Sequence, residues 1–169
     1  MFKKLELPLT DLDLTRLKGP LTGQYGPTFF EYSIADKAYL KNIITSRIKF
    51  HIVPKTVLVT TITSPGAFAH TDRWRTALNY YFDAGQDTTY FYREKNLDSG
   101  SAVREIKIYD HDNLEVLGTF TANQGESYLL DTHTIHSVSV DQSRGSRTML
   151  RFTWEHDSFT TVLDSIELI

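Results

Sequence analysis

Two histidines and an aspartate have the residue types and spacing of a metal site. His70 and Asp72 are two residues apart, so on an extended backbone their side chains leave the same face and can share one ion. His136 supplies a second imidazole much later in the chain. Two imidazoles and one carboxylate form the ligand set of mononuclear non-haem iron(II) oxygenases, in which the remaining coordination positions stay open. We therefore predict that these three residues bind a metal ion and are the catalytic residues.

Arg147 is the candidate for binding an organic acid beside the metal. A guanidinium binds a carboxylate through two parallel hydrogen bonds, which a lysine does not reproduce. Arg151 shares a face with Arg147 on the expected strand and is the alternative. Asn79 and Tyr81 are predicted to line the same pocket, although a satisfied core asparagine and a packed tyrosine fit these positions equally well.

The other histidines are weaker candidates for metal ligands. His133 and His136 alternate to opposite faces, and His136 is favoured because residues 137–140 continue a strand after it. Asp131 either orients a ligand histidine through a hydrogen bond or caps a turn. The histidines at the remaining positions are predicted to bind no metal; they are His51, His111 and His156.

The composition indicates one globular domain with an ordinary fraction of hydrophobic residues. The 169 residues are 40% hydrophobic and 23% charged, and the nine tyrosines and ten phenylalanines favour β structure. The absence of cysteine excludes disulfides, thiolate metal sites and thiol catalysis. A net charge of −3 argues against a dedicated nucleic-acid binder, although Arg73, Arg75 and Arg93 are candidates for a local basic patch. No signal-peptide or membrane-spanning run is apparent, so a cytoplasmic protein is expected.

The pattern of apolar residues predicts many short strands and one helix. Residues 34–47 have helical spacing, with Ser33 as a possible cap and Asp36 in the first turn. Residues 1–32 predict strand fragments and loops with no part in the chemistry. Strands are expected at 56–63, 76–83, 88–94, 103–110, 114–121, 126–131, 134–140 and 147–155.

Turn-forming residues between the strands predict hairpins rather than helical crossovers. They occur at 83–86, 98–101, 110–113, 123–125 and 144–146. We expect a mainly β protein, an antiparallel jelly roll of about eight strands with one N-terminal helix packed on a sheet. The predicted organisation is a single domain, with a flanking region at 1–54, the jelly-roll core at 55–156 and a C-terminal extension at 157–169.

Residues 66–156 resemble the double-stranded β-helix core of the iron(II)- and 2-oxoglutarate-dependent oxygenases. The family pattern is His-x-Asp or Glu, a distal His, and about ten positions later a basic residue that holds the far carboxylate of 2-oxoglutarate. His70, Asp72, His136 and Arg147 match it in order and type. The resemblance implies iron(II), 2-oxoglutarate and dioxygen as cofactor and cosubstrates, and hydroxylation of an unactivated C–H bond.

Within that superfamily, residues 70–79 and the ending Trp154-Glu155-His156 look most like the aspartyl/asparaginyl β-hydroxylase-like branch. The named enzymes of that branch usually lack the carboxylate ligand, whereas Asp72 is present here. Their substrate preference is therefore not transferred, and the expected substrate is an amino acid, a peptide or protein side chain, or a small metabolite. Two alternatives stay open: a cupin-like metal-dependent isomerase or hydrolase, for which Arg147 would be dispensable, and a non-catalytic jelly-roll binding module.

Overall fold

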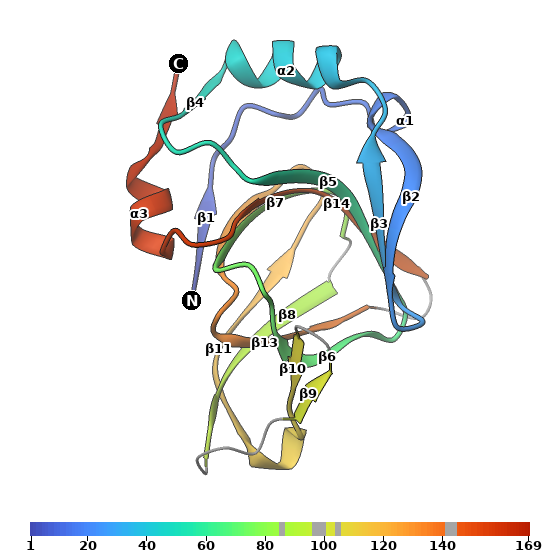
Figure 1. Ribbon diagram of the computed structural model, residues 1–169, viewed down its shortest axis with the longest axis vertical. Helices are drawn as coiled ribbons and strands as arrows, with labels where there is room; N and C mark the ends of the chain where they lie inside the picture. Colours follow the sequence, from blue (N-terminus) through green and yellow to red (C-terminus); the bar gives the residue numbers. More distant parts are fainter. Residues whose placement is uncertain (85–86, 96–100, 104–105, 141–144) are drawn as a thin grey trace.

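The chain folds into two facing antiparallel sheets with short helices at one side (Figure 1). The computed structural model describes residues 1–84, 87–95, 101–103, 106–140 and 145–169. The elements before the core are β1 (Phe2–Leu5), α1 (Leu14–Leu17), β2 (Lys18–Tyr25), β3 (Phe29–Ile34), α2 (Lys37–Thr45) and β4 (Ile48–Phe50). The later elements are β5 (Thr56–Thr63), β6 (Gly66–Thr71), β7 (Thr76–Asp83), β8 (Asp87–Glu94), β9 (Ser101–Val103), β10 (Ile106–Ile108), the 3₁₀ helix η1 (His111–Asn113), β11 (Leu114–Ala122), β12 (Ser127–Asp131), β13 (Ile135–Ser139), β14 (Ser146–Trp154), α3 (Phe159–Asp164) and β15 (Ile166–Leu168).

The strand order identifies the fold. One sheet has the order β1-β12-β7-β14-β5-β3-β2 and the other β11-β8-β13-β6-β10-β9. The core strands alternate between the two sheets from β5 to β8 and again from β11 to β14, while β8 and β11 pair within the six-stranded sheet, so that β5, β7, β12 and β14 face β6, β8, β11 and β13. This arrangement is a double-stranded β-helix, as predicted, and seven of the expected strands match the observed bounds or differ by one residue at an end. In the segment expected at 103–110, the described residues form the end of β9 and the short strand β10, and the strand β6 was not among those expected.

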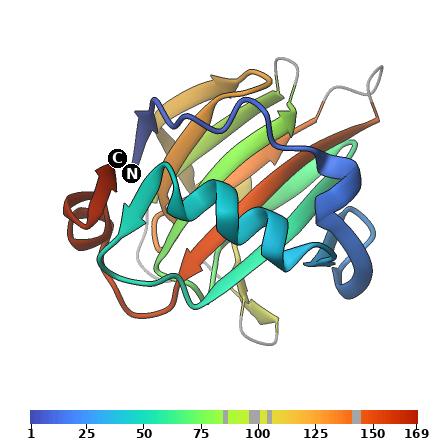
Figure 2. The ribbon, with the colours of Figure 1, turned by 90° about the horizontal axis from the view of Figure 1, so that it is seen from above.

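Helix α2 covers the outer face of the seven-stranded sheet (Figure 2). Its Leu40 and Ile44 are buried in the same cluster as Val59, Leu78 and Leu150, which come from β5, β7 and β14. The helix therefore packs where the sequence predicts, because the apolar stripe of a surface helix is stable only against another apolar face.

Two details of the helices differ from the prediction. The N-cap of α2 is Asp36 rather than Ser33, because the Asp36 carboxylate accepts a hydrogen bond of 2.8 Å from the Tyr39 backbone N–H. The short helices α1 and α3 were not predicted, since four and six residues are too few to show a periodic pattern. In the described residues, no helix has the length and apolar character needed to cross a membrane.

A second apolar cluster fills part of the space between the sheets. Phe91 and Phe120 of the six-stranded sheet pack with Tyr128 and Met149 of the seven-stranded sheet, and Phe2 closes this end of the sandwich. The predicted turns at 83–86, 98–101 and 144–146 lie partly or wholly outside the described residues. The turn at 123–125 is present, with Gly125 in the left-handed region at φ 82°.

Glu126 fixes that turn through three hydrogen bonds. Its carboxylate accepts from Lys4 Nζ at 2.7 Å, from the Asn123 backbone N–H at 2.9 Å and from the Tyr128 hydroxyl at 3.1 Å. Partial burial opposes ionisation, but these bonds outweigh it and lower the pKa of Glu126 to about 2. Because the folded-state pKa lies below the ordinary value of 4.5, this contribution to stability is present above pH 4.5 and is lost as pH falls toward 2.

We therefore expect Glu126→Gln to flatten the decrease in unfolding free energy between pH 4.5 and about 2, as measured by urea denaturation at a series of pH values. Glu155→Gln is the control, since that carboxylate is 41% exposed and its basic neighbours, His156 Nε2 and Lys55 Nζ, are 3.8 and 3.9 Å away. An unchanged slope in the Glu126 variant would show that these hydrogen bonds are not maintained in solution.

Candidate metal centre

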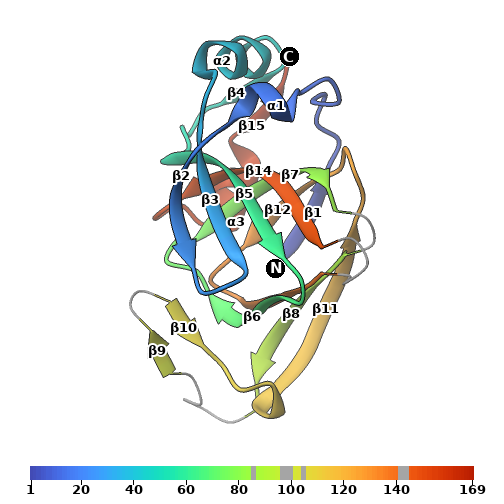
Figure 3. The ribbon, with the colours of Figure 1, turned by 90° about the vertical axis from the view of Figure 1, so that its right-hand side faces the viewer.

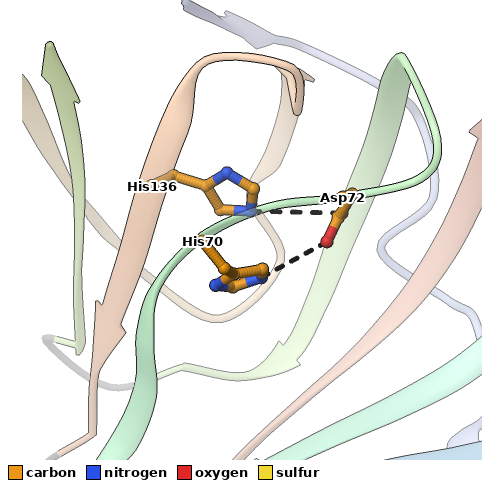
Figure 4. Close-up of side chains that lie close together, drawn as sticks. All are labelled: His70, Asp72 and His136. Carbon is orange, nitrogen blue, oxygen red and sulfur yellow. Dashed lines mark ion pairs between the residues drawn. The ribbon is translucent and has the colours of Figure 1, made fainter. Parts of the chain in front are cut away.

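The three predicted ligands converge at one end of the sandwich (Figure 4). His70 lies near the end of β6, Asp72 follows that strand directly, and His136 is the second residue of β13. His70 Nε2 is 3.3 Å from Asp72 Oδ1, and His136 Nε2 is 4.0 Å from Asp72 Oδ2. Their potential ligand atoms all lie within 4.8 Å of one another. The chain thus brings two nitrogens and one oxygen together around a point that a metal ion can occupy.

A bulge in β6 aims His70 into the sandwich. The pairing of β6 with β13 runs from Gly66–Ser139 and Ala67–Val138 to His70–His136, so two residues of β6 oppose one residue of β13 between the last two pairs. Without this extra residue, strand alternation would turn Ala67 and His70 to opposite faces. The bulge lets both residues line the same interior cavity.

Glycine at position 66 allows the two ligand strands to approach each other. Gly66 has φ +118°, a conformation that other residues rarely adopt, and a Cβ atom there would lie 1.9 Å from the Val138 carbonyl oxygen. A side chain at this position is therefore incompatible with the observed pairing between β6 and β13.

Backbone carbonyl groups determine which ring nitrogen of each histidine carries the proton. His70 Nδ1 is 2.6 Å from the Phe68 carbonyl oxygen, and His136 Nδ1 is 2.9 Å from the Thr134 carbonyl oxygen. Because a carbonyl oxygen only accepts, Nδ1 must be the donor in both rings. In the neutral rings Nε2 then carries the lone pair, and this is the arrangement that orients a histidine for metal binding.

The electrostatics of the three residues also suit a cation. Burial and the neighbouring His70 lower the pKa of His136 to about 4, so its imidazole is neutral at neutral pH. Burial opposes ionisation of Asp72, but the Arg151 guanidinium and the two histidines outweigh it and hold the pKa of this carboxyl far below its usual range. Burial also opposes protonation of His70, yet its interaction with Asp72 raises the pKa of His70. The donor set of one carboxylate and two imidazoles fits iron(II).

The two candidate arginines of β14 lie in different places. Arg151 donates a hydrogen bond from a terminal nitrogen to Asp72 Oδ2, so it touches the expected metal ligand. Arg147 is 1% exposed and lies deeper, where it donates to Thr89 Oγ1 at 3.0 Å and stacks 4.3 Å from the centre of the Tyr81 ring. Of the two arginines, Arg151 is thus the one that contacts Asp72, whereas Arg147 contacts Thr89 and Tyr81.

All the predicted cofactor-binding residues line one interior cavity beside the histidines. Its lining includes Asn79, Tyr81, Arg147 and Arg151 together with Thr89, which the sequence did not single out. Among the described residues, the buried polar atoms without a hydrogen-bond partner include Asn79 Oδ1, Arg147 Nε and Arg151 Nε. Buried polar groups are normally satisfied, so these atoms point to a polar ligand or ordered water in this cavity.

This cavity is small. Its volume is about 30 Å³, roughly the share of liquid volume of one water molecule. A dicarboxylate therefore fits only if lining side chains move.

The remaining predicted residues lie away from the three ligands. His133 is exposed, whereas His136 is buried. Asp131 accepts hydrogen bonds from the His133 backbone N–H at 3.2 Å and the Thr134 hydroxyl at 3.1 Å, so of its two alternatives it has the turn-capping one. His51 instead pairs with Glu167 at 2.7 Å.

Part of residues 1–32, which were predicted to have no part in the chemistry, lines a pocket at the candidate site. The hairpin of β2 and β3 continues the seven-stranded sheet and reaches toward β6 and β10 (Figure 3). Its residues 24–29 and Glu31 line a pocket of about 430 Å³ that also exposes His70 and Asp72. Local sequence gave no signal for this, because the hairpin reaches the site only through long-range pairing of β3 with β5.

No family model matches the chain, and no curated protein matches it by sequence. Solved structures with a similar fold include E. coli ycfD, with 11% identity, a TM-score of 0.46 and coverage of 86% of this chain and 39% of that one. Hydroquinone 1,2-dioxygenase PnpCD has 12% identity, a TM-score of 0.42 and coverage of 81% of each chain. The vicilin of Corylus avellana (hazelnut) has 11% identity, a TM-score of 0.41 and coverage of 92% of this chain and 34% of that one. This chain thus spans about two fifths of the ycfD structure, and likenesses at this level carry no conclusion about activity.

Proposed function

We propose that the chain is an iron(II)- and 2-oxoglutarate-dependent oxygenase that hydroxylates an unactivated C–H bond. The observation that carries the proposal is the convergence of His70, Asp72 and His136 beside a cavity that contains a buried arginine remote from Asp72. These three residues would hold the ion, and three protein ligands would leave coordination positions for an organic acid and dioxygen. Arg147 supplies the charge that a second carboxylate of the acid requires.

In this proposal each residue has a defined task. His70, Asp72 and His136 hold the iron, which when bound supplies the reduction of dioxygen. Arg147 binds the remote carboxylate of 2-oxoglutarate, with Asn79 and Tyr81 beside it, and Arg151 orients Asp72. The reaction balances as R–H, 2-oxoglutarate and dioxygen giving R–OH, succinate and carbon dioxide. The protein's residues bind and orient, while the cofactor carries the oxidation.

The direct test measures succinate release and oxygen consumption in the same sample. We expect both to require iron(II) and 2-oxoglutarate and to occur in equal amounts, with ascorbate present to keep the iron reduced. Free amino acids, peptides and small metabolites are screened as substrates for stimulation of the rate. Oxygen consumption without 2-oxoglutarate, or metal-dependent conversion of a substrate without oxygen, would contradict the proposal.

The 30 Å³ cavity favours a second candidate, a metal-dependent isomerase or hydrolase of the cupin type. Such an enzyme needs the metal and one bound water but no keto acid, and the cavity has the size of one water. Under this alternative, substrate turnover would proceed without 2-oxoglutarate and Arg147 would have only a structural role. The two candidates share the metal site and differ in the cosubstrate.

A further inference from the structure

The pocket outside the metal centre has the size of a small-molecule site. Its volume of about 430 Å³ lies in the lower part of the range typical of ligand pockets, roughly 300–1,000 Å³. It reaches His70 and Asp72 from the surface, and Phe29, Ala67, His70 and Arg151 line both this pocket and the inner cavity. A molecule bound here would therefore lie next to the metal, on the side open to solvent.

The walls of the pocket are mostly aromatic and aliphatic. Tyr25 and Phe29 come from the β2–β3 hairpin, and Phe68, Trp74 and Ile108 line the same pocket. The side chain of Phe68 is 69% exposed, which is unusual for a phenylalanine on a strand whose neighbour Ala69 is fully buried. These surfaces suit a hydrocarbon group more than a sugar or a phosphate.

The pocket also contains one pair of opposite charges besides Asp72 and Arg151. Glu31 of β3 is 8% exposed, and Arg73 lies at the exposed rim with its guanidinium 4.1 Å from the centre of the Trp74 ring. Burial raises the pKa of Glu31, while the cations Arg151 and Arg73 oppose that change, so both arginines lie close enough to act on Glu31. Tyr25 also hydrogen-bonds to the Glu31 side chain.

This charge pattern suits a ligand that carries both signs. A ligand with only a positive charge would meet Arg73 and Arg151, and a ligand with only a negative charge would meet Glu31 and Asp72. A zwitterion satisfies both signs, since an ammonium can pair with Glu31 while a carboxylate forms two hydrogen bonds with Arg73.

We propose, as an inference that rests on the proposed function, that the substrate is a free α-amino acid with an apolar side chain. It binds in this pocket. Its ammonium group contacts Glu31, its carboxylate contacts Arg73, and its side chain packs against Tyr25, Phe68 and Trp74. Glu31 and Arg73 are thereby the residues that determine specificity for an unblocked amino acid. Hydroxylation breaks one C–H bond of this substrate and forms C–OH, with one oxygen atom of dioxygen entering the product and the other entering succinate.

Binding tests the proposal independently of turnover. L-Leucine, L-phenylalanine and L-methionine are titrated by calorimetry into the full chain loaded with manganese(II). N-acetyl-L-leucine lacks the ammonium and L-leucinamide lacks the carboxylate. We expect each blocked compound to bind at least about tenfold more weakly than L-leucine, because each loses a charge-assisted hydrogen bond.

Two variants then test which residue of the protein binds each end of the ligand. Glu31→Gln keeps the shape of the side chain, and we expect it to abolish the preference for L-leucine over N-acetyl-L-leucine without reducing affinity for the acetylated compound. Arg73→Gln should abolish the preference for L-leucine over L-leucinamide. Arg75→Gln is the matched control: this arginine is exposed two residues further along the chain, is not part of the pocket lining, and should leave both preferences unchanged.

The outcomes separate this inference from the proposed function. Equal binding of free and blocked compounds, or tighter binding of N-acetyl-L-leucine, overturns the amino-acid assignment and in the second case favours a peptide. Succinate release that no free amino acid stimulates also overturns it while the oxygenase function stands. Selective binding of free amino acids that depends on Glu31 and Arg73, without any succinate release, supports the pocket assignment and contradicts the oxygenase function.

Discussion

Replacement of His136 by alanine is expected to reduce affinity for iron(II) or manganese(II) by more than about 100-fold. Loss of a residue that merely orients a ligand typically costs 10- to 100-fold in metal affinity, and His136 is expected to be a ligand itself. The remaining pair, His70 and Asp72, would hold the ion with two protein atoms. Calorimetry under nitrogen measures the affinity, and the stabilisation of the folded chain by saturating metal gives a second measurement.

His133→Ala is the matched control for this experiment. His133 has the same residue type three positions earlier but is exposed and lies outside the cluster of potential ligand atoms. Its replacement should leave metal affinity unchanged. If His136→Ala bound manganese as tightly as the unaltered chain, the assignment of the distal ligand would be wrong.

Arg147→Ala is expected to weaken 2-oxoglutarate binding at least roughly tenfold while the metal stays bound. Hydrogen bonds to charged groups contribute about 1.5–3 kcal/mol, and about 1.4 kcal/mol corresponds to a factor of ten. Arg147→Lys should recover only part of the loss, since the ammonium keeps the charge but not the planar pair of donors. Titration of 2-oxoglutarate into the manganese-loaded chain gives these affinities without turnover.

Arg151→Ala tests whether the cosubstrate uses the other arginine. Because the Arg151 guanidinium contacts Asp72, this variant should change metal affinity, and at saturating metal it should affect 2-oxoglutarate binding less than Arg147→Ala does. If Arg151→Ala lost more 2-oxoglutarate affinity than Arg147→Ala, the carboxylate site would be assigned to Arg151, next to the metal. If neither variant weakened binding, the isomerase or hydrolase alternative would take precedence.

The sequence was sufficient to predict the sandwich and the convergence of His70, Asp72 and His136, whose role as metal ligands stays a prediction. Strands such as β5 and β7 have β-branched or aromatic residues with turn formers at their ends, so local pattern and final structure agree. Alternation along β14 also placed Arg147 and Arg151 on one face and Leu150 on the other, as observed. The strand predictions succeeded because each depends on residues that are close in sequence, whereas His136 was joined to His70 and Asp72 through the family pattern.

Features that depend on distant pairing could not be predicted. The bulge after Ala67 is defined only by the partner strand β13, and the wall formed by the β2–β3 hairpin depends on the pairing of β3 with β5. The contact of Arg151 with Asp72 joins residues far apart in the chain, and spacing along β14 alone does not distinguish a metal-side arginine from a deeper one. Glu31 was missed for the same reason, since its own strand has no recognisable motif.

The close approach at Gly66 makes the metal site depend on a residue with no chemical function. The same pairing of β6 with β13 that brings Gly66 against Val138 also sets His70 opposite His136, four residues further along the strand. A larger residue at this position would force the strands apart or out of register, and the two imidazoles would separate with them. The absence of a side chain at position 66 is therefore a requirement of the site, and tolerance to mutation there should be as low as at a predicted ligand.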